Sequence, residues 1–78
     1  MSRPKRWVAA CSKAMDGLQE LIELQEEYQE WRDNLPEQLE SSAVAEKLDT
    51  IVDMDLQSAL DVVEEADGAD LPLGFGRD

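Results

Sequence analysis

Histidine is absent from this chain, and cysteine occurs once, as Cys11. Without histidine no Ser-His or Cys-His pair can form for nucleophilic catalysis, and ordinary zinc sites are excluded. One cysteine excludes an intramolecular disulfide, and its place on an apolar helical face predicts a buried small side chain. No Gly-rich phosphate loop is present either. The sequence therefore predicts a protein that is not an enzyme and that has no cofactor or metal.

Basic residues and long apolar runs are also scarce. The 78 residues include 7 Lys and Arg against 19 Asp and Glu, which gives a formal net charge of −12. Such a charge disfavours direct binding to nucleic acid or to an anionic membrane. No apolar stretch has the length of a signal peptide or a membrane span, and a lone free thiol fits a reducing compartment. We therefore expect a cytoplasmic protein.

The length of the chain leaves room for one small domain, which buries only roughly 60–65% of its unfolded surface. Domains of this size are usually stabilised by disulfides, by a metal or by a partner chain. Since the sequence offers neither of the first two, we expect a homodimer, or docking onto another protein.

Apolar residues between Pro4 and Pro36 recur at helical spacing and predict one long helix over about residues 4–33. The central row, interrupted by Gln25 and Arg32, consists of Trp7, Cys11, Ala14, Leu18, Leu21, Tyr28 and Leu35. The two flanking rows consist of Val8, Met15 and Ile22, and of Ala10, Gly17, Leu24 and Trp31. A face this broad normally packs against more than one neighbour.

The segment from Asn34 to Glu37 predicts a turn and the N-cap of a second helical segment over about 36–52. Ser41 and Ser42 either cap a helix again or lie inside a continuous one.

A third helical segment is expected over about 55–67, after a break at which Asp53 or Asp55 is the cap. Gly68 is its natural C-cap. The predicted fold class is all-α: an antiparallel helical hairpin over residues 1–67, with an extended C-terminal tail over 68–78.

Charge order along the first helix opposes the helix dipole, whose N-terminus prefers anions, because the bases lie at its start and the acids at its end. An antiparallel second layer would place the acidic end of the last helix beside that basic start. We therefore expect Arg6 or Lys13 to lie near Glu64, Glu65 and Asp67.

Acidic residues on the first helix form a row opposite the apolar face, with successive members about 5 Å apart along the axis. The predicted partner-binding acidic face consists of Asp16, Glu20, Glu23, Glu26, Glu27 and Glu30. A rigid row of carboxylates resembles a phosphate track and could occupy a basic nucleic-acid groove on another protein. The alternatives are a solvated face, or a face paired with bases of an oligomer partner.

A calcium loop is the other acidic pattern. Asp53, Asp55, Gln57, Asp61 and Glu64 partly match the spacing of an EF-hand. However, Ser58 stands where that loop has glycine, and the apolar spacing across the same stretch predicts helix. The sequence therefore disfavours calcium binding.

Aromatic and large apolar side chains exceed what a hairpin this small can cover, and aromatic residues dominate interface energetics. The predicted oligomer or partner contacts are Trp7, Leu24, Tyr28, Trp31, Leu71, Leu73 and Phe75. The tail residues among them belong either to a lid on the core or to a docking motif.

Two segments, EYQEWRDNLPE at 27–37 and DLPLGFGRD at 70–78, resemble small uncharacterised acidic helical proteins of phages and prophages. The resemblance implies an accessory protein in a bacterial cell, similar in size and charge to nucleic-acid mimics that block host defence. The leading hypothesis is therefore a non-enzymatic inhibitor of a host nucleic-acid-handling or defence protein. The alternative is a structural or adaptor module that assembles through its apolar face and tail.

Overall fold

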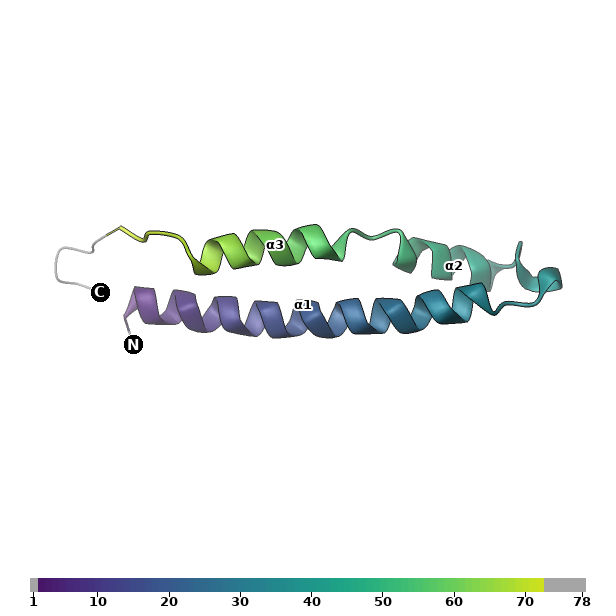
Figure 1. The fold of residues 1–78 in the computed structure, drawn as a ribbon, viewed down its shortest axis with the longest axis horizontal. Helices are drawn as coiled ribbons and strands as arrows, with labels where there is room; N and C mark the ends of the chain where they lie inside the picture. Colours follow the sequence, from purple (N-terminus) through teal and green to yellow (C-terminus); the bar gives the residue numbers. More distant parts are fainter. Residues whose placement is uncertain (1, 73–78) are drawn as a thin grey trace.

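The computed structural model describes residues 2–72, and all of its regular structure is helical, as predicted. Helix α1 spans Arg3–Asp33, a 3₁₀ turn η1 spans Glu37–Leu39, α2 spans Ala43–Val52 and α3 spans Leu56–Asp67. In Figure 1, α1 forms one layer, and α2 and α3 run back along it as the second. The result is a rod of 64 × 16 × 16 Å.

Helix α1 begins and ends within one residue of the predicted bounds. At its start, the Ser2 hydroxyl accepts a hydrogen bond from the Lys5 amide at 3.4 Å, and Pro4 lies in the first turn, where its missing N–H costs nothing. At its end, the Asn34 side chain donates to the Glu30 carbonyl at 2.9 Å. Asn34 therefore closes α1, and the prediction that it caps the next helix was wrong.

The predicted segment 36–52 is not one helix. A single turn, η1, follows Pro36, and α2 begins only at Ala43. The reason is Ser42, whose hydroxyl accepts from the Ala45 amide at 3.3 Å and donates to the Leu39 carbonyl at 2.6 Å. Both bonds hold Ser42 in extended backbone, so it caps α2 instead of continuing the turn before it.

The predicted break between α2 and α3 is confirmed, and Asp55 is the N-cap of α3. The Asp55 carboxylate accepts from the Ser58 hydroxyl at 2.6 Å and from the Ser58 amide at 3.1 Å. These two donors lower the pKa of Asp55 below its ordinary value. Helix α3 ends at Asp67, and Gly68 is its C-cap, as expected.

The contact between the layers follows one line along α1, which we call the inner seam. Its residues are buried or half-buried and recur every three or four positions: Cys11, Met15, Leu18, Ile22, Gln25, Gln29 and Arg32. The burial of Cys11 is as predicted. Among residues 2–72, the buried apolar residues are Cys11, Ala45, Leu48 and Leu60. Such a core is small, so polar contacts fix much of the register.

Three polar contacts tie the layers together. The Trp7 indole N–H donates to the Ala66 carbonyl at 2.6 Å. The Gln25 amide donates to carbonyls at the α2–α3 break, including that of Met54 at 2.8 Å. Near the turn, Arg32 forms an ion pair with Asp49 at 2.7 Å. Early residues of α1 thus meet late residues of the chain, which makes the layers antiparallel.

Candidate protein-binding surfaces

The six predicted carboxylates from Asp16 to Glu30 are all exposed on α1. The inner seam explains their placement, because Asp16, Glu23 and Glu30 each follow an inner-seam residue by one position. At about 100° per residue they point away from α2 and α3. Within the described part of the chain, none of the six forms an ion pair. Their charges are therefore available to a partner.

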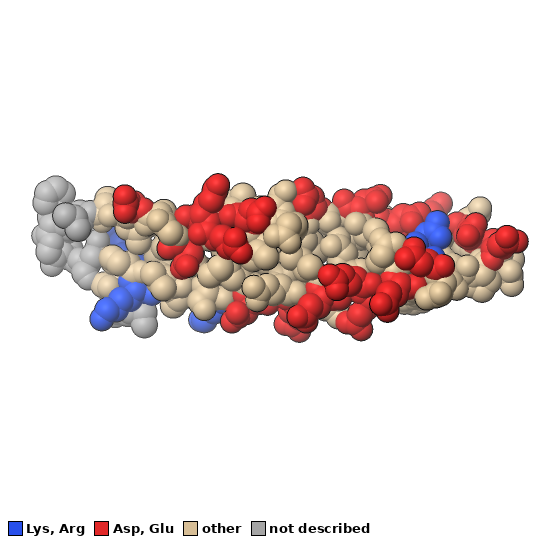
Figure 2. Space-filling model, viewed as in Figure 1, with Lys and Arg blue, Asp and Glu red and all other residues tan. Residues whose placement is uncertain are grey.

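Bases are concentrated at one end of the rod. Figure 2 shows most of the blue side chains at the N-terminal end of α1, a further blue group near the turn end, and red side chains along both layers. The α1 and α3 ends expected to meet do lie together, because Trp7 reaches Ala66. However, neither Arg6 nor Lys13 forms an ion pair with the acids at the end of α3. The start of α1 is thus joined to the end of α3 by the hydrogen bond of the Trp7 indole, and not by the charge pairing that we expected.

Arg32, which interrupts the apolar pattern, has a specific role. Its guanidinium donates to the Asp49 carboxylate of α2, and this hydrogen bond raises the pKa of Arg32 above its ordinary value. The arginine, which is the last residue of the inner seam, thus links α1 to α2.

A second apolar line on α1, which we call the outer seam, is exposed along its whole length. Its N-terminal half consists of Trp7, Ala10, Ala14 and Gly17. Its C-terminal half consists of Leu21, Leu24, Tyr28 and Trp31. From Ala10 onward each member directly precedes an inner-seam residue, so this line lies about 100° around the helix from the contact with α2 and α3. The broad apolar face predicted from the sequence is therefore covered on one side only.

The aromatic residues of the outer seam lie near the two ends of α1, and each is exposed. Trp7 is 43% exposed, Tyr28 36% and Trp31 52%. Tyr28 and Trp31 stack on each other, with ring centroids 6.1 Å apart and planes inclined by 21°. These rings are therefore partly exposed in one chain, and the stack offers an apolar surface.

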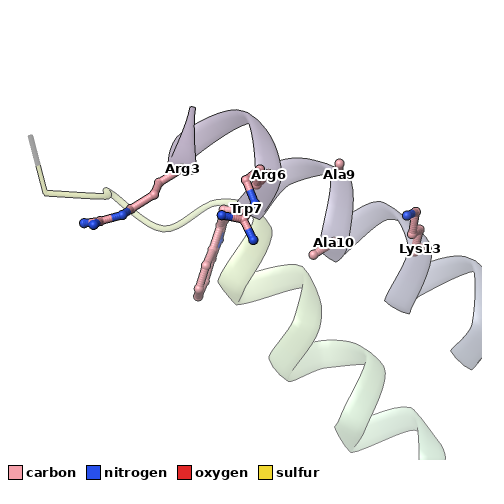
Figure 3. A pocket seen from close by; sticks show the side chains of 6 residues that line it. All are labelled: Arg3, Arg6, Trp7, Ala9, Ala10 and Lys13. Atoms are coloured by element: carbon pink, nitrogen blue, oxygen red, sulfur yellow. The ribbon is translucent and has the colours of Figure 1, made fainter. Parts of the chain in front are cut away.

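A hollow lies at the opposite end of the outer seam from this stack. Figure 3 shows it beside Trp7 and Ala10, with the basic side chains of Arg6 and Lys13 on its rim. Its volume is about 580 Å³. The predicted site residues omitted these bases and the alanine. Their spacing was the available signal, because Arg6 and Lys13 are seven residues apart and flank the outer seam.

The start of the tail contacts the first turn of α1. Leu71 is half-buried, and with Pro72 it lines a smaller hollow of about 210 Å³ that Pro4 and Trp7 share. Leu73 and Phe75, the other predicted tail contacts, lie outside the described residues.

The remaining candidates offer no reactive arrangement. Cys11 is buried against the second layer, and the stretch with the partial calcium-loop spacing is helical from Leu56 onward. Residues 2–72 hold no group of three or more Cys, Asp or Glu placed to share a metal ion. Across the same residues, no helix has both the length and the apolarity to cross a membrane.

No protein-family model, curated protein or solved structure matches the chain.

Proposed function

We propose that this chain is a non-enzymatic binding protein whose acidic face on α1 occupies the basic nucleic-acid-binding groove of another protein. In the setting that the sequence resemblance implies, it would be a phage-encoded inhibitor of a host nucleic-acid-handling or defence protein. An inhibitor of this kind requires a rigid helical hairpin. The contacts that join Trp7, Gln25 and Arg32 to the second layer support such a fold.

The observation that carries the proposal is that the carboxylates of the acidic row are exposed and unpaired within residues 2–72. They follow one face of a continuous helix. From Asp16 to Glu30 the row covers roughly 21 Å of helix axis. Like charges at this spacing destabilise a helix. A basic groove would remove that repulsion and would supply the counter-charges that the chain lacks.

The test compares two triple charge reversals that change the net charge equally. One replaces Asp16, Glu23 and Glu30 by Lys on the acidic row. The matched control replaces Glu46, Glu64 and Glu65, which are also exposed but lie on α2 and α3. Each protein is used to capture ligands from a bacterial lysate, and bound proteins are released with salt or with a short DNA or RNA duplex.

The proposal predicts that the wild-type chain and the control retain a basic protein that both salt and the duplex displace. The variant with Lys at Asp16, Glu23 and Glu30 should retain at least about tenfold less of this basic protein. The reason is that charge reversal removes the same electrostatic contacts that salt screens. Equal retention by both variants, or release by neither salt nor duplex, would refute the mimic.

A structural or adaptor module remains the second candidate, and the exposed stack of Tyr28 and Trp31 favours it. An adaptor of this kind would bind a different protein through the outer seam. Its binding would be insensitive to salt and lost in Trp31→Ala. It also requires the outer seam to be free of a second copy of the chain.

A further inference from the structure

One copy of the chain exposes far more surface than its size requires. The radius of gyration is 18.6 Å, whereas a compact chain of this length has about 11–12 Å. The accessible surface is 6303 Å², which exceeds the expectation for a compact chain of this mass by roughly 1,500 Å². A standard interface needs only about 800 Å² from each partner. The chain therefore has enough spare surface for a stable dimer.

The outer seam has the pattern of a dimer contact. Its members recur at alternating steps of three and four residues from Trp7 to Trp31, and all of them are exposed. Apolar residues sustained at this heptad spacing on one helix are typical of pairing with another helix. Gly17 fits such a role, because a Cβ at this position would meet nothing within 4 Å in a single chain. Packing within one chain thus gives no reason for this glycine, which costs about 1 kcal/mol relative to alanine in a helix.

Side-chain size along the seam selects an antiparallel pairing. After Trp7, small residues occupy its first half, and large ones occupy its second. An antiparallel copy centred near Gln19 sets Ala10 opposite the partner's Tyr28, and Ala14 opposite the partner's Leu24. Gly17 then faces the partner's Leu21. A parallel pair would stack small residues on small ones at one end and leave voids there, which well-packed helices avoid.

The hollow beside Ala10 fits the same register. In the antiparallel pair, the partner's stacked Tyr28 and Trp31 reach the position of this hollow, between Trp7 and the bases on its rim. The aromatic stack would thus fill a space that residues 2–72 of one chain leave open. Arg6 and Lys13 can then contact the ring faces, an arrangement that adds favourable cation–π energy.

Charge gives an independent argument for the same orientation. Arg6, Lys13, Glu20 and Glu27 follow one another at intervals of seven along one edge of the outer seam. An antiparallel copy brings the basic half of this edge beside the acidic half of the other. A parallel copy would instead set this edge beside the other copy's inner seam, which the second layer covers, and would pair none of these charges. Exposed pairs are each worth only about 0–1 kcal/mol, but they select orientation. This pairing also accounts for a charge order that the helix dipole opposes.

We propose that two copies of this chain associate through their outer seams, with the α1 helices antiparallel and each aromatic stack seated in the other copy's hollow. Of the acidic face, the dimer uses only Glu20 and Glu27, while Asp16, Glu23 and Glu30 lie away from the seam, so the dimer can be tested separately from binding to a basic groove.

The first test is the mass of the full-length protein in solution at micromolar concentration, by sedimentation equilibrium. We expect twice the mass of one chain. Ala14→Glu places a charge in the seam at an exposed position and should weaken dimerisation at least about 100-fold. Gln19→Glu adds the same charge on the opposite side of α1 and should leave the mass unchanged. If the wild-type protein were monomeric, the outer seam would have to bind a different protein, and the proposal would be overturned. An Ala14→Glu protein that dimerised as well as wild type would overturn it too.

A second test does not depend on whether the seam variant folds. Replacing Arg6 and Lys13 by Glu makes the edge uniformly acidic and should weaken the dimer. Adding Glu20→Lys and Glu27→Lys inverts the whole edge and should restore it. Failure of this rescue would contradict the antiparallel pairing.

Orientation can also be measured directly by electron–electron double resonance between single spin labels in a Cys11→Ala background. Labels at Asp33→Cys should be separated by roughly 40 Å along the axis in the antiparallel dimer. Labels at Gln19→Cys should show no such axial separation and serve as the control. Equal distances at both positions would indicate a parallel pair and overturn the proposal.

Discussion

Gln25 interrupts the apolar pattern of α1, yet the structure gives it the most extensive polar contact between the layers. Its side-chain amide lies 2.9 Å from the Ile51 carbonyl, 3.3 Å from that of Val52 and 2.8 Å from that of Met54. These carbonyls lie where α2 ends, so no helical amide of α2 is there to bind them. Gln25 therefore caps α2 from a different helix and fixes the break before α3.

Gln25→Leu tests this role. The amide has two N–H donors, and each hydrogen bond contributes about 0.5–1.5 kcal/mol net. Half-burying a leucine returns roughly 1 kcal/mol. The Ile51 carbonyl keeps the Met54 amide at 3.4 Å, but the part-buried Val52 carbonyl loses its side-chain donor, at a cost of about 1–3 kcal/mol. We expect the free energy of unfolding to fall by about 1–2 kcal/mol, which lowers Tm by roughly 5–15 °C for a chain of this size.

The assay is thermal and urea unfolding followed by circular dichroism, at one protein concentration because a dimer makes Tm concentration-dependent. Gln29→Leu is the matched control, since Gln29 is also on the inner seam but bonds only Asp33 of its own helix. Amide exchange should accelerate at the end of α2 and the start of α3 in the Gln25 variant alone. Equal stability of the two variants, or a Gln25→Leu protein as stable as wild type, would refute the capping role.

Three further predictions concern the other local contacts. Trp7→Phe keeps most of the ring but removes the indole N–H that binds the Ala66 carbonyl. We expect a loss of about 1 kcal/mol, with faster amide exchange confined to the last turn of α3. A double-mutant cycle on Arg32→Ala and Asp49→Ala should give a small coupling that declines with added salt, and a salt-independent coupling would contradict an exposed ion pair. Because the pKa of Asp55 is lowered in the folded chain, its cap stabilises α3 above the ordinary carboxyl pKa and is lost as the pH falls through the lower value. The stability difference between wild type and Asp55→Ala should therefore shrink in acid, and a difference that grows there would be inconsistent.

Helical periodicity predicted which residues of α1 are apolar neighbours, but not which of them the second layer would cover. The predicted central row combined Cys11 and Leu18 with Leu21 and Tyr28. The structure divides it, because the first two belong to the inner seam and the last two to the outer seam. A rotation of about 100° around the helix axis, which corresponds to one residue, separates the inner seam from the outer seam. Periodicity gives the width of a face, while the position of the neighbour depends on contacts from outside the helix.

Polar residues help to fix the position of the second layer around α1. Their roles could not be predicted from the sequence, because their partners lie outside α1. Gln25 and Arg32 looked like interruptions because their hydrogen-bond acceptors lie far along the chain, at the end of α2 and at Asp49. By contrast, Asp55 was one of the two caps expected, and the amide that it accepts from lies only three residues away. Local hydrogen bonds can be anticipated from sequence spacing, whereas contacts between layers cannot.

The two proposals divide the acidic residues of α1 into groups with separable roles. Glu20 and Glu27 flank the outer seam, where we propose that they face the bases of a second copy. Asp16, Glu23 and Glu30 lie away from both seams and remain free in the proposed dimer. Reversing the latter three to Lys should therefore abolish binding to a basic groove while the mass stays that of a dimer. Reversing Glu20 and Glu27 should weaken the dimer, because the whole edge becomes basic. If both sets changed binding and mass alike, one surface would serve both purposes, and the division between the seam and the acidic face would be wrong.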